Sequence, residues 1–102
     1  MNTLVKQHRA ELEKLCRRYH VRRLELFGSA ATGDYKPGKS DLDFLVEFES
    51  LTAGTYSDTY FGLLENLEQL FGSPVDLVGA SAIRNPYFRQ SVDQTKALLY
   101  AA

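Results

Sequence analysis

The chain has 102 residues and a formal net charge of −1, with 44% hydrophobic and 25% charged residues. This is the length of one globular domain, and we expect residues 1–102 to form a single one. The near-neutral charge argues against a protein that holds nucleic acid in a global basic field. A domain of this size buries one core and leaves little sequence for a separate acceptor-binding lobe.

Cys16 is the sole cysteine, which excludes an intrachain disulfide and a multi-cysteine metal site. It stands among apolar helix positions, so we expect a small core residue rather than a nucleophile. No stretch reaches the length of a membrane span, and residues 1–30 lack the continuous apolar segment of a signal peptide. These features favour a cytoplasmic protein that does not enter a membrane.

A local basic cluster surrounds Tyr19 and consists of Arg17, Arg18, Arg22 and Arg23. We interpret it as the solvated end of an amphipathic helix rather than as a nucleic-acid site. A docking patch for an acidic partner is the alternative interpretation.

Apolar residues at three- and four-residue spacings predict one helix from about Asn2 to Tyr19. His8 lies on its apolar face, where we expect a partly buried or capping histidine. Leucines that alternate with charged residues predict a strand over 21–27, which ends at Gly28. Residues 29–32 fit a single helical turn.

Residues 33–39 are dense in turn formers and predict a loop. The following segment, 41–48, has an apolar residue at every second position and therefore predicts a strand. Its alternation places Asp41 and Asp43 on one face. The opposite face carries Leu42, Phe44, Val46 and Phe48.

The rest of the chain predicts a helix over 57–71, a strand over 74–78, and a helix that begins at Pro86. The last segment, 97–100, fits either a strand or a frayed helix end. A helix between two successive strands suggests a right-handed crossover between parallel neighbours. The order predicts an α/β fold with a small mixed sheet and helices packed on it. The inner stripe of the last helix is expected to include Phe88, Val92 and Thr95.

Three aspartates are the candidate catalytic and metal-binding groups. Asp41 and Asp43 share a face at the start of a strand, and their repulsion is offset most readily by a divalent cation. Oxygen ligands favour magnesium, manganese or calcium over zinc. Asp76 would join the pair if its strand is the neighbour of 41–48. The alternative is that all three are ordinary polar residues of turns and strand surfaces.

Gly28-Ser29 is the candidate phosphate-binding turn. A strand that stops at glycine and turns through serine exposes N–H groups and a hydroxyl beyond the strand end. A generic turn is the alternative, and the spacing does not match a Walker A motif.

These parts together resemble a known family. The run GSAATGDYKPGKSDLDFLVEF is similar to the Gly-Ser…Asp-x-Asp motif of the DNA-polymerase-β-like nucleotidyltransferase superfamily. The later PVDLV segment and the length resemble the minimal nucleotidyltransferase (MNT) family, and the similarity extends to NPYF near the end. The resemblance implies a polymerase-β-like core.

The resemblance also implies roles for the candidate residues. Gly28 would permit close approach of the nucleoside triphosphate, and Ser29 would hydrogen-bond its terminal phosphates. Asp41 and Asp43 would bind two Mg²⁺ ions. Asp76 would complete the acceptor-side metal site and help deprotonate the attacking hydroxyl. The attack on the α-phosphorus would release pyrophosphate.

Members of this family often form toxin–antitoxin pairs with HEPN-domain ribonucleases, and the resemblance implies that function here. The protein would transfer AMP from ATP to a hydroxyl of its HEPN toxin. Many members have arginine where this chain has Thr32, which lacks the charge of a guanidinium. A non-catalytic antitoxin that neutralises its partner by docking is therefore the alternative. The sequence leaves open the nucleotide preference and whether the chain forms a homo-oligomer.

Overall fold

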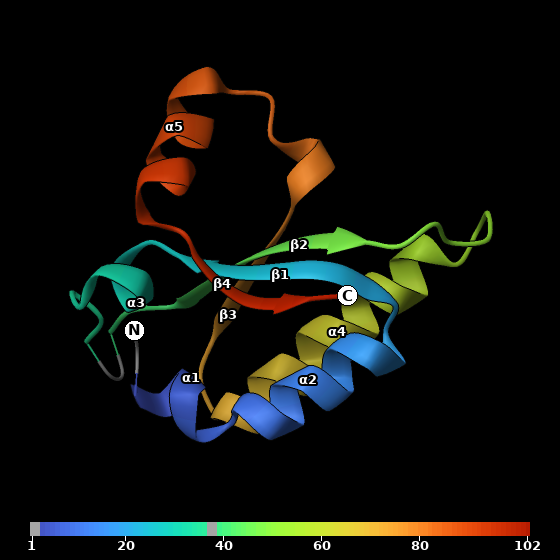
Figure 1. Cartoon of the computed structure of the whole chain (residues 1–102), viewed down its shortest axis with the longest axis horizontal. Coiled ribbons are helices and arrows are strands. Elements are labelled where there is room, and N and C mark those ends of the chain that lie inside the picture. Colours follow the sequence, from blue (N-terminus) through green and yellow to red (C-terminus); the bar gives the residue numbers. More distant parts are fainter. Residues whose placement is uncertain (1–2, 37–38) are drawn as a thin grey trace.

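The computed structural model describes residues 3–36 and 39–102, which form one four-stranded sheet with helices on both faces (Figure 1). The strands are β1 (Val21–Phe27), β2 (Leu42–Phe48), β3 (Val75–Gly79) and β4 (Ala97–Ala101). The helical segments are α1 (Thr3–Gln7), α2 (Arg9–Arg18), α3 (Ser29–Thr32), α4 (Tyr56–Phe71), the 3₁₀ turn η1 (Ala80–Ala82) and α5 (Pro86–Thr95).

The sheet is mixed, as predicted, with the order β3-β2-β1-β4. β1 is antiparallel to both of its neighbours, β2 and β4. β2 and β3 are parallel, and α4 connects them, so the predicted crossover between parallel neighbours is confirmed. The last segment is a strand, because β4 pairs with the free edge of β1.

The single N-terminal helix predicted from Asn2 to Tyr19 is two helices, α1 and α2, which are separated at His8. The backbone of His8 leaves the helical region (φ −108°, ψ 20°), and its Nδ1 is 2.9 Å from the carbonyl oxygen of Leu4. The imidazole also packs edge-on against Phe71 at 5.6 Å between ring centroids. These contacts compensate for the interrupted helical hydrogen bonds, and the histidine is partly buried as expected.

Parts of two predicted elements lie outside the described residues: Asn2 of the N-terminal helix, and Pro37 and Gly38 of the loop over 33–39. Within residues 3–36 and 39–102, no helix combines the length and the apolar character that crossing a bilayer requires.

The two faces of the sheet carry separate apolar clusters. Figure 1 shows α2 and α4 below the sheet and α5 above it. The larger cluster lies on the α2 and α4 side and includes Cys16. The pKa of the Cys16 thiol is raised to about 12, mainly by burial. Cys16 is thus a core residue, as expected. The smaller cluster, on the α5 side, consists of Phe27, Leu45 and Val92.

Helix α5 begins as predicted, because Asn85 caps it by accepting hydrogen bonds from the N–H groups of Tyr87 and Phe88. The inner-stripe prediction is confirmed for Val92, which is fully buried. It is confirmed only in part for Phe88, which is 40% exposed but packs in a T-shaped arrangement against the buried Phe27.

Candidate active site

Two neighbouring strands bring Asp43 and Asp76 together. The strands β2 and β3 are parallel, and these two aspartates are register partners. Partners on adjacent strands have Cα atoms about 5 Å apart and side chains on the same face. The adjacent residues Phe44 and Leu77 are buried on the α4 side, so both carboxylates lie on the side of α5. The strand pairing that was predicted for Asp76 is therefore confirmed.

Asp41 is exposed and lies one residue before β2, so the predicted start of this strand was one residue too early. Pairing with β3 begins where the N–H of Leu42 donates to the carbonyl of Pro74 at 3.1 Å. On the other side, β1 ends at Phe27, which is the partner of Asp43. Strand periodicity therefore does not fix the direction of Asp41, in contrast to the prediction.

The electrostatic environment of Asp43 is unfavourable for its charge. The pKa of this carboxyl is raised from its ordinary value of 3.8 to about 6. Burial is the largest cause, followed by the negative charges of Asp76 and Asp41. Both other carboxylates are therefore close enough to repel it. A cation between them would remove this repulsion.

Gly28 lies directly against the Asp43 carboxylate. Its backbone has φ +70° and ψ −149°, a region that essentially only glycine adopts. A Cβ atom at this position would be 2.5 Å from Asp43 Oδ2. The sequence predicted a glycine that lets a nucleotide approach. The close approach of the Asp43 carboxylate is a second reason why this position requires glycine.

Ser29 begins α3, the short helix that follows Gly28. The four-residue helix ends at Gly33, whose N–H donates to the Ser29 carbonyl at 3.1 Å. Thr32 donates its hydroxyl hydrogen to Asp34 Oδ2 at 3.0 Å. The hydroxyl of Thr32 is thus used to organise the loop. The turn therefore has no guanidinium from this position.

Helix α4 holds the strand that carries Asp76. The hydroxyl of Tyr60 donates to the carbonyl of Leu77, and Glu68 Oε2 accepts the N–H of Val75 at 3.4 Å. These bonds satisfy backbone groups on both sides of Asp76 at the edge of the sheet. Burial and the charge of Asp76 raise the pKa of Tyr60. The periodicity of the sequence gives no signal for the bond from Tyr60 to Leu77.

The donor set fits a hard divalent cation, because Asp43, Asp76 and Asp41 offer only oxygen ligands and repel one another. In the side-chain positions of the described residues, however, no three His, Cys, Asp or Glu groups converge closely enough to hold a metal ion. Metal binding by all three aspartates would therefore require their side chains to turn toward a common point.

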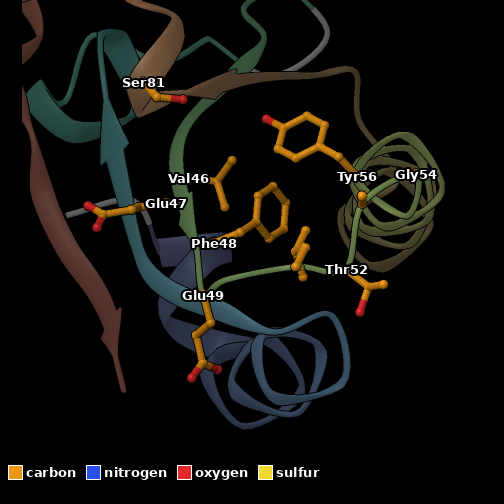
Figure 2. A pocket seen from close by; sticks show the side chains of 10 residues that line it. Val46, Glu47, Phe48, Glu49, Thr52, Gly54, Tyr56 and Ser81 are labelled. Atoms are coloured by element: carbon orange, nitrogen blue, oxygen red, sulfur yellow. The ribbon is translucent and has the colours of Figure 1, made fainter.

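A pocket of about 330 Å³ lies at the other end of β2 (Figure 2). Figure 2 shows Phe48 and Tyr56 side by side in it, where their rings pack edge to face with 5.5 Å between centroids, while Glu49 points away. Phe48 lies five positions after Asp43 along the strand, which corresponds to about 16 Å. The pocket is thus separate from the carboxylates and is not part of the candidate active site.

The basic cluster is partly neutralised within the chain. Arg22 Nη1 is 3.2 Å from Glu47 Oε1, and Arg23 Nε is 3.3 Å from Glu25 Oε1. Arg18 lies over the ring of Tyr19. This arrangement agrees with the solvated surface that the sequence analysis favoured over a nucleic-acid site.

The sequence and the fold have counterparts in known proteins. Residues 9–98 match the family model described as a nucleotidyltransferase domain. The chain belongs to this nucleotidyltransferase family. It is therefore a nucleotidyltransferase, an enzyme class that acts on nucleoside triphosphates, and the resemblance noted in the sequence is confirmed.

Individual members of the family are similar over most of the chain. A candidate protein adenylyltransferase of Methanocaldococcus jannaschii is 38% identical over 77 residues, which are 76% of this chain and 75% of that protein. The solved structure of a candidate minimal nucleotidyltransferase is 32% identical, covers 95% of both chains and has a TM-score of 0.76. An MNT antitoxin structure from Shewanella oneidensis, in complex with a tri-AMPylated HEPN toxin, shares the fold at 20% identity. Its TM-score is 0.64, with 95% of this chain and 72% of that chain covered.

Proposed function

We propose that this nucleotidyltransferase transfers AMP from ATP to a hydroxyl group of a partner protein. The observation that carries the proposal is the register pair Asp43 and Asp76, in which Asp43 lies directly against the glycine of the Gly28-Ser29 turn. A transferase of this kind needs a carboxylate group close to a phosphate-binding turn. Here the end of β1, the starts of β2 and β3, and the turn meet at the same end of the sheet.

We assign two Mg²⁺ ions to Asp41, Asp43 and Asp76. The mutual repulsion that raises the pKa of Asp43 supports this assignment, as do the oxygen-only ligands. The ions, when bound, supply charge neutralisation at the reacting phosphate and at the leaving group. In this account, each aspartate has to keep its carboxylate deprotonated and turned toward the shared site.

The residues of the chain then have separate tasks in the transfer. The hydroxyl of Ser29 donates a hydrogen bond to the terminal phosphates, and Gly28 leaves room for them. Asp76 accepts the proton of the attacking hydroxyl. The new bond forms between that oxygen and the α-phosphorus, the bond from the α-phosphorus to the bridging oxygen breaks, and pyrophosphate leaves with the electron pair.

We propose a HEPN-domain toxin as the partner and an antitoxin role for this chain. The similar protein from M. jannaschii is named as an adenylyltransferase of proteins, and the similar fold from S. oneidensis was solved with an AMPylated HEPN toxin. Such a pair would work in the cytoplasm. Residues 1–102 would act as one minimal domain, and the partner would supply most of the acceptor-binding surface.

A non-catalytic antitoxin is the second candidate, and two observations favour it. Thr32 is hydrogen-bonded to Asp34 and cannot replace an arginine at the triphosphate. In addition, no three potential ligand side chains converge in the described part of the chain. In this case the chain would neutralise the toxin by binding alone.

The variant Asp41→Ala/Asp43→Ala distinguishes the two candidates. The toxin is incubated with ATP, Mg²⁺ and either variant or unaltered chain, and both AMP incorporation and residual toxin activity are measured. The enzyme hypothesis predicts that incorporation and neutralisation are lost together. Asp58→Ala/Glu65→Ala removes two exposed carboxylates from α4 and serves as the charge-matched control. Neutralisation that survives in Asp41→Ala/Asp43→Ala would instead support the docking hypothesis.

A further inference from the structure

Helix α5 contacts β1 and the turn after it at three points. Near its start, Phe88 packs edge-on against Phe27 with 6.0 Å between ring centroids. At its end, the hydroxyl oxygen of Thr95 accepts the N–H of Gly28 at 3.0 Å. One residue further, Lys96 Nζ lies 3.9 Å from the buried carboxylate of Glu25. The helix therefore holds the strand end from which the candidate phosphate turn begins.

The hydroxyl of Thr95 has both of its roles filled. It donates to the carbonyl of Ser91, at 3.2 Å, or to that of Val92, at 3.4 Å, which is the local bond that threonine commonly forms in a helix. The lone pairs of the hydroxyl oxygen remain available to accept a hydrogen bond, and the N–H of Gly28 donates to them. The two residues are 67 positions apart, so the bond is a tertiary one.

The Gly28 peptide needs such an anchor. Glycine populates many backbone conformations, and φ +70° with ψ −149° is not held by any side chain of its own. The carbonyl of Gly28 accepts the N–H of Ala31 at 3.1 Å and starts α3. The orientation of the Gly28 backbone therefore determines where Ser29 lies relative to Asp43.

We propose that Thr95 is a positioning residue for nucleotide binding, which acts by fixing the Gly28 peptide and with it the Ser29 turn. The inference rests on the proposed function of Gly28-Ser29 as the phosphate turn. Thr95 does not contact the nucleotide in this account. Its loss would make the turn adopt several conformations, and the triphosphate would have to select one of them.

The test compares Thr95→Val, which keeps the shape and loses the acceptor, with Thr95→Ser, which keeps the hydroxyl. The dissociation constant of a non-hydrolysable ATP analogue with Mg²⁺ is measured by calorimetry, together with the melting temperature. We expect Thr95→Val to raise the dissociation constant roughly threefold to tenfold, the range of one lost hydrogen bond. Thr95→Ser is expected to bind like the unaltered chain.

Thr59→Val is the matched control. The hydroxyl of Thr59 donates to the carbonyl of Thr55 at 2.9 Å, four residues back on α4, and thus makes the same local bond far from the turn. Thr59→Val is expected to lower the melting temperature about as much as Thr95→Val does, without weakening the binding of the nucleotide. An unaltered chain that binds no nucleotide would overturn the proposed function and this inference with it. Normal binding by the unaltered chain and by Thr95→Val would overturn this inference alone.

Discussion

The substitution Gly28→Ala probes the closest approach in the candidate site. The added methyl group would lie 2.5 Å from Asp43 Oδ2, so the carboxylate has to move. The backbone region of Gly28 costs a non-glycine residue about 2 kcal/mol, and the displaced carboxylate adds about 1 kcal/mol or more. We therefore expect a loss of about 3 kcal/mol in the free energy of unfolding.

Gly54→Ala separates the two contributions. Gly54 also has a positive φ (+87°), but a methyl group there meets none of the described atoms within 4 Å. It should lose only the backbone contribution. In a background of Asp43→Ala, which removes the clashing oxygen, Gly28→Ala should be milder by about 1 kcal/mol, a coupling that a double-mutant cycle detects.

The assay is urea denaturation at pH 7.5 in EDTA, so that metal ions do not stabilise the folded state. The reasoning is refuted if Gly28→Ala costs no more than Gly54→Ala. It is also refuted if the cost of Gly28→Ala is unchanged in the Asp43→Ala background, because the contact with the carboxylate would then have no energetic effect.

Three further substitutions test the surroundings of the site by the same denaturation assay. The carboxyl pKa of Asp43 is raised, so its ionised form destabilises the fold above about pH 6 and has no effect well below pH 4. The change from 3.8 to about 6 corresponds to at most about 3 kcal/mol, and partial exposure reduces this to about 1–2 kcal/mol. Asp43→Asn should therefore stabilise the metal-free protein by that amount at pH 7.5 but not at pH 3.5, unlike the exposed control Glu65→Gln; an equal gain at both pH values would contradict this. Tyr60→Phe removes the bond to the Leu77 carbonyl and should cost about 1 kcal/mol, and an unchanged unfolding midpoint would exclude a role in holding β3. Asn85→Ala removes both capping bonds of α5 and should also cost about 1 kcal/mol, whereas no loss would mean that water replaces the cap.

Much of the fold could be predicted because it follows from local patterns. Alternation placed β1 and β2, and the helix between β2 and β3 implied the parallel pairing that brings Asp76 to Asp43. Turn chemistry gave the start of α5 at Pro86. These features depend on residues that are close in sequence or on one general rule of chain connection.

The errors and omissions involve contacts between distant residues. The interruption at His8 goes with its packing against Phe71, and the start of β2 after Asp41 depends on where β3 and β1 provide partners. The bond from Gly28 to Thr95 spans 67 residues. Such contacts have no periodic signal in one sequence, so the residues that position the site were not found from the pattern that identified its aspartates.

The most direct test of the account follows the label of ATP into the partner. The unaltered chain is incubated with its HEPN partner, Mg²⁺ and ATP labelled at either the α- or the γ-phosphate, with Asp43→Asn as the inactive variant. The account predicts that the α-label enters the partner protein, that the γ-label leaves as pyrophosphate, and that Asp43→Asn transfers neither. Incorporation of the γ-label, or undiminished transfer of the α-label by Asp43→Asn, would contradict it.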